Sequence, residues 1–207
     1  YRLLVDRGLE GVTLYMETYH RETYAGVHRR GRKRDYDYRL EAIARAGRAG
    51  VRRLSLGALL GLYHWWADGF WLGLHARNLQ KECWQSAVSL SFPRLRHAPE
   101  RFQVEHLPTD RELVQLMLAL RIFLPEVGFN LSTRESSQLR DRLIPLGVTM
   151  MSAGSSTRPG GYAHLDNDAA LEQFEIEDGR SPAEVAAAIR RAGYDPVWKD
   201  FDRAFVE

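Results

Sequence analysis

Residues 11–20 read GVTLYMETYH, and this stretch predicts the fold of the chain. Its first five residues form a short apolar run that begins at a glycine, as buried parallel strands tend to do, and polar residues follow directly. Four more stretches share this pattern, at residues 53–56, 87–92, 128–132 and 148–152. We therefore expect five short strands, at residues 11–15 and at these four places.

Amphipathic helical stretches fill the gaps between the expected strands. Residues 35–49 place apolar side chains on one face and end at Gly50, which is typical of the residue after a helix. Residues 68–84 also have a helical pattern. Residues 109–112 (Thr-Asp-Arg-Glu) and 181–184 (Ser-Pro-Ala-Glu) are capping boxes, so each predicts the start of a helix.

Repeated strand–helix units indicate an α/β fold with a parallel sheet and helices on its faces. The pattern favours a partial (β/α)8 TIM-type barrel with five parallel strand–helix units. The three N-terminal units would then precede Tyr1, because such barrels typically need about 250 residues. We expect residues 1–160 to form the barrel part and residues 161–207 a C-terminal helical extension packed on it. An open doubly wound sheet is the alternative, although no Gly-rich dinucleotide fingerprint follows any expected strand.

Polar residues follow four of the expected strands directly. These strand ends include Glu17 and His20, Arg94, Arg134, and Ser152. In barrels of this class the chemistry takes place at the C-terminal ends of the strands. Guanidinium groups can bind carboxylates, and carboxylates or hydroxyls can bind ammonium groups, so the set suits zwitterions such as amino acids. The alternative is that they are ordinary cap and turn residues.

Composition excludes several classes of protein. The 207 residues are 44% hydrophobic and 27% charged, an ordinary globular mixture. Cys83 is the only cysteine, which excludes a disulfide framework and any Cys-based zinc or iron–sulfur site within this chain. No segment suits a membrane span or a secretory signal, and the single cysteine fits a reducing compartment, so we expect a cytoplasmic protein. The first residue is Tyr1, which indicates a cut within a longer chain.

Other motifs are weaker. The basic run Arg29, Arg30, Arg32, Lys33 and Arg34 favours a solvated loop over a phosphate site, and no nucleic-acid motif accompanies it. Glu17-x-x-His20 has no second copy to make a di-iron site. His75 and His97 are interpreted as packed or exposed rather than metal-bound, and we predict no metal ligands in this chain.

Several strings together resemble a known family. They lie at residues 11–20, 57–62 (GALLGL), 84–96 (ending SFPRLR), 131–136 (LSTRES), 152–155 (SAGS) and 194–200 (YDPVWKD). In combination they resemble the 2-iminoacetate synthase family, the radical S-adenosylmethionine tyrosine lyases of thiamine biosynthesis. The resemblance runs through nearly the whole chain.

The resemblance implies an activity, cofactors and partners. A [4Fe–4S] cluster held by a Cys-x3-Cys-x2-Cys loop cleaves S-adenosylmethionine, and the resulting radical attacks tyrosine. The Cα–Cβ bond of L-tyrosine then breaks to give 2-iminoacetate (dehydroglycine) and 4-cresol. The implied partners are a reduced electron donor and thiazole synthase, which takes the imine. The cluster loop lies upstream in the family, so this chain alone is expected to be inactive.

The resemblance also suggests roles for single residues. Glu17 and Arg39 would bind the ammonium and carboxylate ends of S-adenosylmethionine, with His20 in the same cofactor site. Arg134 would bind the tyrosine carboxylate, because arginine forms bidentate pairs with carboxylates. Ser152 and Arg94 would complete the substrate site, and no catalytic residue is assigned.

Departures from the family pattern and three alternatives remain. Met16 stands where the family usually has Gln, and residues 64–66 (His-Trp-Trp) replace a common Asp-Trp-Arg. The tyrosine lyase of hydrogenase maturation shares several motifs but has a cysteine-bearing C-terminal extension, which favours the thiamine enzyme. Biotin synthase fits less well. A degenerate, non-catalytic barrel that serves as a binding protein is the alternative from another class.

Overall fold

A parallel sheet organises the protein, as the sequence predicts. The computed structural model describes residues 1–96, 106–156 and 176–198. Five strands, hydrogen-bonded in chain order, form the sheet: β1 (Gly11–Glu17), β2 (Arg53–Ala58), β3 (Ala87–Ser91), β4 (Gly128–Leu131) and β5 (Met150–Met151). The chain divides into two compact units, residues 1–130 and residues 131–207, and the boundary falls within β4.

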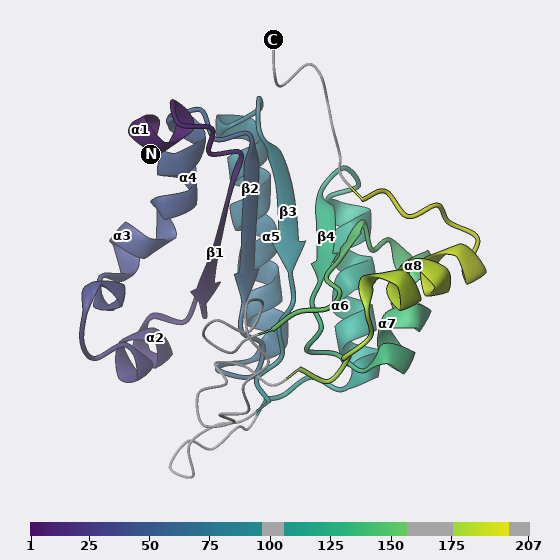
Figure 1. Ribbon diagram of the computed structural model, residues 1–207. Coiled ribbons are helices and arrows are strands. Elements are labelled where there is room, and N and C mark those ends of the chain that lie inside the picture. The colour runs from purple at the N-terminus through teal and green to yellow at the C-terminus, as the bar shows by residue number, and fades with distance from the viewer. Residues whose placement is uncertain (97–105, 157–175, 199–207) are drawn as a thin grey trace, which may run out of the picture. The chain divides into compact units, whose positions relative to one another are not determined.

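The first unit contains most of the sheet, and Figure 1 shows β1, β2 and β3 running side by side in the same direction. The register pairs Leu54 of β2 with Val12 of β1 and with Val88 of β3. Leu54 and Leu90 have no exposed area because the strands are covered by helices. The helices of the first unit are α1 (Arg2–Val5), α2 (Arg21–Val27), α3 (Tyr36–Leu40), α4 (Ala42–Arg48), α5 (Trp65–Glu82) and α6 (Asp110–Phe123), with a 3-10 turn η1 (Arg32–Arg34).

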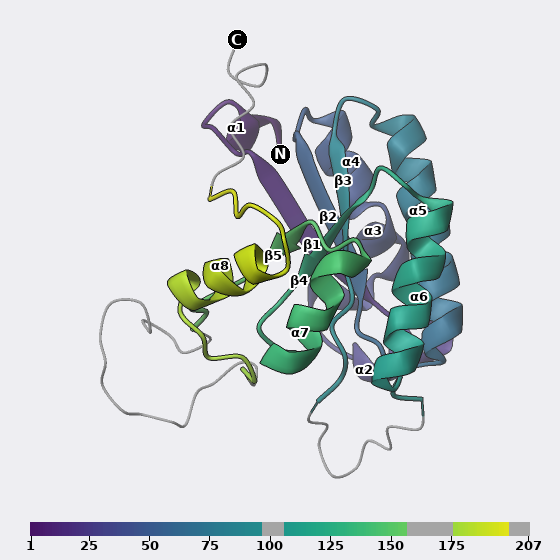
Figure 2. The same cartoon turned by 90° about the vertical axis from the view of Figure 1, so that its right-hand side faces the viewer.

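Helices α5 and α6 lie side by side in the first unit (Figure 2). Two glycines allow this close approach. A Cβ atom on Gly69 would lie 2.3 Å from Leu116 Cδ1, and one on Gly73 would lie 2.8 Å from Leu120 Cδ2. Alanine at either position would therefore force the two helices apart or shift the leucines.

The second unit contains β5, α7 (Ser137–Leu143), the 3-10 turn η2 (Ile144–Leu146) and α8 (Pro182–Arg191). Ser152 N–H donates to the carbonyl of Leu131 over 3.0 Å, which links the end of β5 to the end of β4. Val185, Ala186 and Ala188 form the buried face of α8. Leu139, Leu143 and Ile144 form that of α7 and η2.

The helix-start predictions are confirmed, and others need correction. Both capping boxes form, from Thr109 to Glu112 and from Ser181 to Glu184. The single helix expected at residues 35–49 is wrong: α3 and α4 are separate helices, divided at Glu41, which ends one and precedes the other. The expected strand at residues 148–152 is shorter, because only Met150 and Met151 are in β5. Among the described residues no helix is long and apolar enough to cross a membrane.

Candidate functional site

The backbone at Glu17 is strained, and Glu17 stands at the C-terminal end of β1. Its φ is +71°, and among the described residues it is the one non-glycine with a positive φ. The register between β1 and β2 shifts between Tyr15 and Glu17, and Leu59 N–H donates to the carbonyl of Glu17 over 2.7 Å. Such strain costs about 1–3 kcal/mol and tends to occur at functional positions. The bulge redirects the Glu17 side chain out of the regular alternation of the strand.

Two cations gather around the Glu17 carboxylate. Lys33 Nζ lies 3.0 Å from Glu17 Oε1, and an Arg39 guanidinium nitrogen lies 3.6 Å from the same oxygen. Arg39 is held in place by two donations to the carbonyl of Tyr15, at 3.0 and 2.6 Å. The structure therefore brings together Glu17 and Arg39, which the sequence placed in one site. A carboxylate beside two cations can bind both ends of an amino acid.

A buried aspartate lies under the turn that follows Glu17. Asp68 of α5 is 1% exposed, and its Oδ1 accepts hydrogen bonds from the Thr18 hydroxyl at 2.9 Å and from Tyr19 N–H at 2.7 Å. Its Oδ2 is buried and has no partner within the described part of the chain. Burial raises the pKa of Asp68 to about 6, although the two hydrogen bonds and the charge of His20 work in the opposite direction.

His20 is the N-cap of α2, since its Nδ1 accepts from Thr23 N–H at 3.4 Å. Its ring stacks on Tyr63, with the ring centroids 3.9 Å apart. The neighbouring Tyr19 hydroxyl lies 2.9 Å from His75 Nδ1, and burial lowers the pKa of His75 to about 4. His75 is thus a packed histidine, as interpreted from the sequence. Groups of three or more possible metal ligands are absent from the described residues.

Arg94 follows β3 and is only 9% exposed. It pairs with Asp110 over 2.8 Å and donates to the carbonyl of Pro108 over 3.1 Å. Both partners lie at the start of α6. These contacts give Arg94 a structural task, fixing the start of α6, beside the substrate role that the sequence suggests.

In the second unit, Arg134 and Ser152 follow β4 and β5. Arg134 is half-buried, and its N–H lies 3.4 Å from Ser132 Oγ. The Ser152 side chain is exposed. Thr133, directly before Arg134, is 4% exposed, and its carbonyl accepts hydrogen bonds from Glu177 N–H and Asp178 N–H, both at 3.0 Å.

A buried ionic network lies beneath these two strand ends. The side chains of Arg140 and Asp178 are 0% exposed and form an ion pair. Arg180 adds hydrogen bonds to Asp178 at 2.7 and 2.9 Å and pairs with Asp141 at 2.9 Å. Burial acts to raise the pKa of Asp178, but the hydrogen bonds from Arg180 and Arg140 outweigh it and lower the pKa to about 2. Burial lowers the pKa of Arg140.

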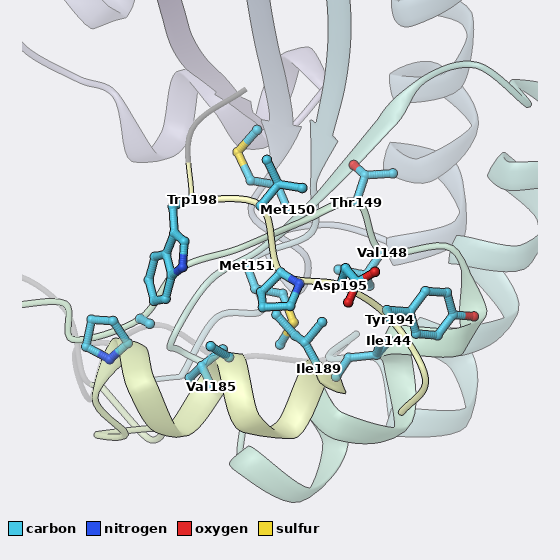
Figure 3. A pocket seen from close by; sticks show the side chains of 15 residues that line it. Ile144, Val148, Thr149, Met150, Met151, Val185, Ile189, Tyr194, Asp195 and Trp198 are labelled. Carbon is cyan, nitrogen blue, oxygen red and sulfur yellow. The ribbon is translucent and has the colours of Figure 1, made fainter. Parts of the chain in front are cut away.

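An apolar cavity of about 400 Å³ also lies in the second unit. Figure 3 shows Val185 and Ile189 of α8 on one side of it, Met151 of β5 facing them, and Trp198 at its edge. Among the described residues that line it, Asp195 alone is acidic or basic, and no predicted site residue is one of them. The cavity borders the end of β5, because Met151 and Ala153, the neighbours of Ser152 in the chain, line it.

Sequence reasoning missed the residues that hold these turns. Asp68 lies in the first turn of a helix, where an acidic residue is common and attracts no notice. Arg140 carried a usable signal, because it lies among Leu139, Leu143 and Ile144 on the buried face of α7 and η2. A charge on an apolar helix face predicts a buried pair, but the partner Asp178 is 38 residues away and could not be identified from spacing.

Comparison with known proteins finds a family model and two curated relatives that agree with one another. The family model described as "Biotin and Thiamin Synthesis associated domain" matches residues 91–195. The chain is 47% identical over 203 residues to 2-iminoacetate synthase of Escherichia coli (strain K12), and 44% identical over 203 residues to that of Salmonella typhimurium. Each match covers 98% of this chain and 53% of the relative, so the chain spans about half the length of these curated relatives.

Solved structures of a hydrogenase maturase share the fold. The crystal structure of HydG, a maturase of the [FeFe]-hydrogenase, matches with a TM-score of 0.85 and 35% identity, over 96% of this chain and 43% of that one. The X-ray structure of HydG from Carboxydothermus hydrogenoformans matches with a TM-score of 0.83 and 34% identity, over 94% of this chain and 44% of that one. Together with the parallel sheet, these matches are consistent with the partial barrel that the sequence predicts.

Proposed function

The chain belongs to the family of the Biotin and Thiamin Synthesis associated domain, and we propose that it is part of a 2-iminoacetate synthase. That enzyme is a radical S-adenosylmethionine lyase that cleaves the Cα–Cβ bond of L-tyrosine to 2-iminoacetate and 4-cresol. The observation that carries the proposal is 47% identity to the Escherichia coli enzyme across 98% of this chain. The proposal includes these products, a cytoplasmic location, and delivery of the imine to thiazole synthase.

The end of β1 suits the amino-acid end of S-adenosylmethionine. Glu17 would accept hydrogen bonds from its ammonium group, and Arg39 would donate to its carboxylate. Both side chains are more than four-fifths buried, so a bound zwitterion would be partly shielded from water. His20, the proposed third residue of this site, lies three residues after Glu17 at the start of α2, and its ring is held by stacking on Tyr63. When bound, the cofactor supplies the radical that attacks tyrosine.

The chain cannot supply the thiolates of a [4Fe–4S] cluster. It contains a single cysteine, and that residue, Cys83, is buried. The cluster ligands would therefore come from a part of the complete protein outside this chain. Reconstitution of the isolated chain with iron and sulfide should give no stoichiometric cluster, because one thiolate cannot replace three. A stable chromophore at about one cluster per chain would contradict this.

The ends of β4 and β5 suit the amino-acid end of tyrosine. Arg134 would bind the carboxylate through two parallel hydrogen bonds, which fix its orientation as well as its position. Ser152 would add a hydrogen bond to the same end. Arg94, which follows β3 in the first unit, is a further substrate-binding candidate on the sequence alone. Orientation matters because the radical must meet one chosen hydrogen at near-contact distance.

The test is an assay of the complete protein. Anaerobic incubation with a reductant, S-adenosylmethionine and L-tyrosine should yield 4-cresol, and omission of tyrosine should abolish it. Glu17→Ala should weaken the binding of S-adenosylmethionine in calorimetry. A complete protein with an intact cluster that cleaves S-adenosylmethionine but makes no 4-cresol would contradict the proposal.

The tyrosine lyase of hydrogenase maturation is the second candidate. The fold match to HydG supports it, but sequence identity to HydG is 35%, against 47% to 2-iminoacetate synthase. A degenerate, non-catalytic barrel that serves as a binding protein is a third hypothesis. The same assay distinguishes such a protein from a tyrosine lyase, because it would release no 4-cresol.

A further inference from the structure

The buried ionic network of the second unit consists of Arg140, Asp141, Asp178 and Arg180. Arg140 and Asp178 are completely enclosed, and Arg180 is 20% exposed. Two apolar residues of similar volume would fill the same space with no loss of hydration, so stability alone gives little reason for charges here. Charged groups offer directional hydrogen bonds in place of non-directional packing.

These hydrogen bonds join three separate segments at the strand ends. Arg140 donates to Asp178 and to the carbonyl of Ser152, at the end of β5. The backbone N–H of Asp178 donates to the carbonyl of Thr133, at the end of β4, over 3.0 Å. Gly154 N–H donates to the carbonyl of Arg180 over 3.1 Å, a second link from the turn after β5 to residues 177–180.

The points that are joined coincide with the proposed substrate residues. Ser152 is itself bound through its carbonyl, and Thr133 is directly followed by Arg134. A rotation of the peptide between Thr133 and Arg134 would redirect the guanidinium of Arg134. The two bonds to the Thr133 carbonyl oppose that rotation, and the side-chain bonds of Asp178 to Arg140 and Arg180 help to hold its backbone N–H in place.

We infer that Arg140 and Asp178 are a positioning pair for the amino-acid end of the substrate. The pair sets the directions of Arg134 and Ser152, and through it residues 177–180 control how tightly the carboxylate of tyrosine is bound. The inference rests on the proposed function of the site. Neither residue touches the substrate, so the pair governs tyrosine affinity and leaves S-adenosylmethionine binding unchanged.

The test separates position from stability by replacing both charges together. In the complete protein, the double variant Arg140→Met with Asp178→Val nearly keeps the volume of the pair and removes its hydrogen bonds, so it should remain folded. Calorimetry should show a tyrosine Kd weakened at least about tenfold, or ~1.4 kcal/mol, and an unchanged Kd for S-adenosylmethionine. The KM for tyrosine should rise together with the tyrosine Kd. A folded double variant whose tyrosine Kd stays within about twofold of the parent would overturn the inference.

If the double variant does not fold, a single variant and a matched control still test the inference. Asp178→Asn keeps the shape and one acceptor, and it should weaken tyrosine binding several-fold. Val185→Ala removes buried apolar volume from α8 in the same unit without touching the network. If Val185→Ala weakens tyrosine binding as much at an equal loss of stability, the pair has no positioning role. A parent protein that binds no tyrosine would instead count against the proposed function.

Discussion

The turns after β1 and β4 are each held by a buried aspartate, but the two aspartates have opposite electrostatic surroundings. Asp68 accepts hydrogen bonds from two neutral donors, Thr18 and Tyr19, and its pKa rises to about 6. Asp178 accepts from two guanidinium groups, and its pKa falls to about 2. The comparison shows that a buried carboxylate can anchor a strand end with or without a charged partner, and that the partner decides the pH range over which the anchor loses or gains stability.

The largest expected difference between the two turns is in stability. Asp178→Ala leaves Arg140 buried without its main partner, which should cost about 3–5 kcal/mol of unfolding free energy. Asp68→Ala leaves only the neutral donors of Thr18 and Tyr19 unpaired, which should cost about 1–3 kcal/mol. Urea unfolding of the complete protein and both variants measures the two losses. Equal losses would show that the charged partners make no difference.

The second difference is in the dependence of stability on pH. The folded pKa of Asp68 lies above its ordinary value of 3.8, so the folded state binds the proton more tightly and this group's contribution falls as pH rises from about 4 to about 6. The fall is ~3 kcal/mol, at 1.36 kcal/mol for each pKa unit. Buried His75, with a folded pKa of about 4, changes in the opposite direction over a similar window, so the parent curve alone does not reveal Asp68.

The difference between parent and variant isolates each aspartate. The stability of the parent relative to Asp68→Asn should decrease across pH 4–6. The stability of the parent relative to Asp178→Asn should stay constant there, because the folded pKa of Asp178 is below its ordinary value and its contribution is lost only as pH falls from about 4 to about 2. If the two stability differences change in the same way between pH 4 and 6, the two aspartates do not differ in their pH dependence and the prediction is wrong.

The sequence predicted the framework of both turns better than what holds them. Periodicity and capping boxes identify the strands and the starts of α6 and α8, because these signals are local. They also place Glu17 and Arg134 at strand ends. Asp68 and Asp178 are beyond such reasoning, since they act on residues 50 and 45 positions away, Thr18 and Thr133. The positive φ of Glu17 has no local signal either, because glycine or asparagine is expected in that conformation.

The two turns should also differ in which ligand they affect. Arg134→Lys keeps the charge but loses the planar fork, so in the complete protein 4-cresol formation should fall about 100-fold. S-adenosylmethionine binding, which we propose for the turn after β1, should not change. Product analysis and calorimetry on one preparation measure both. Parent rates of 4-cresol formation with unchanged tyrosine affinity would remove Arg134 from the substrate site.

The smallest effect concerns the strain at Glu17, which has no counterpart in the turn after β4. Glycine adopts a φ of +71° without steric cost, so Glu17→Gly should raise the unfolding free energy by ~0.5–1 kcal/mol. The same change removes the carboxylate between Lys33 and Arg39, so binding of S-adenosylmethionine should weaken. Glu17→Gln is the matched control, because it removes the charge and keeps the strain. Stability should therefore rise in the glycine variant alone, while cofactor binding falls in both. A glycine variant less stable than the glutamine variant would mean that the conformation at Glu17 is not strained.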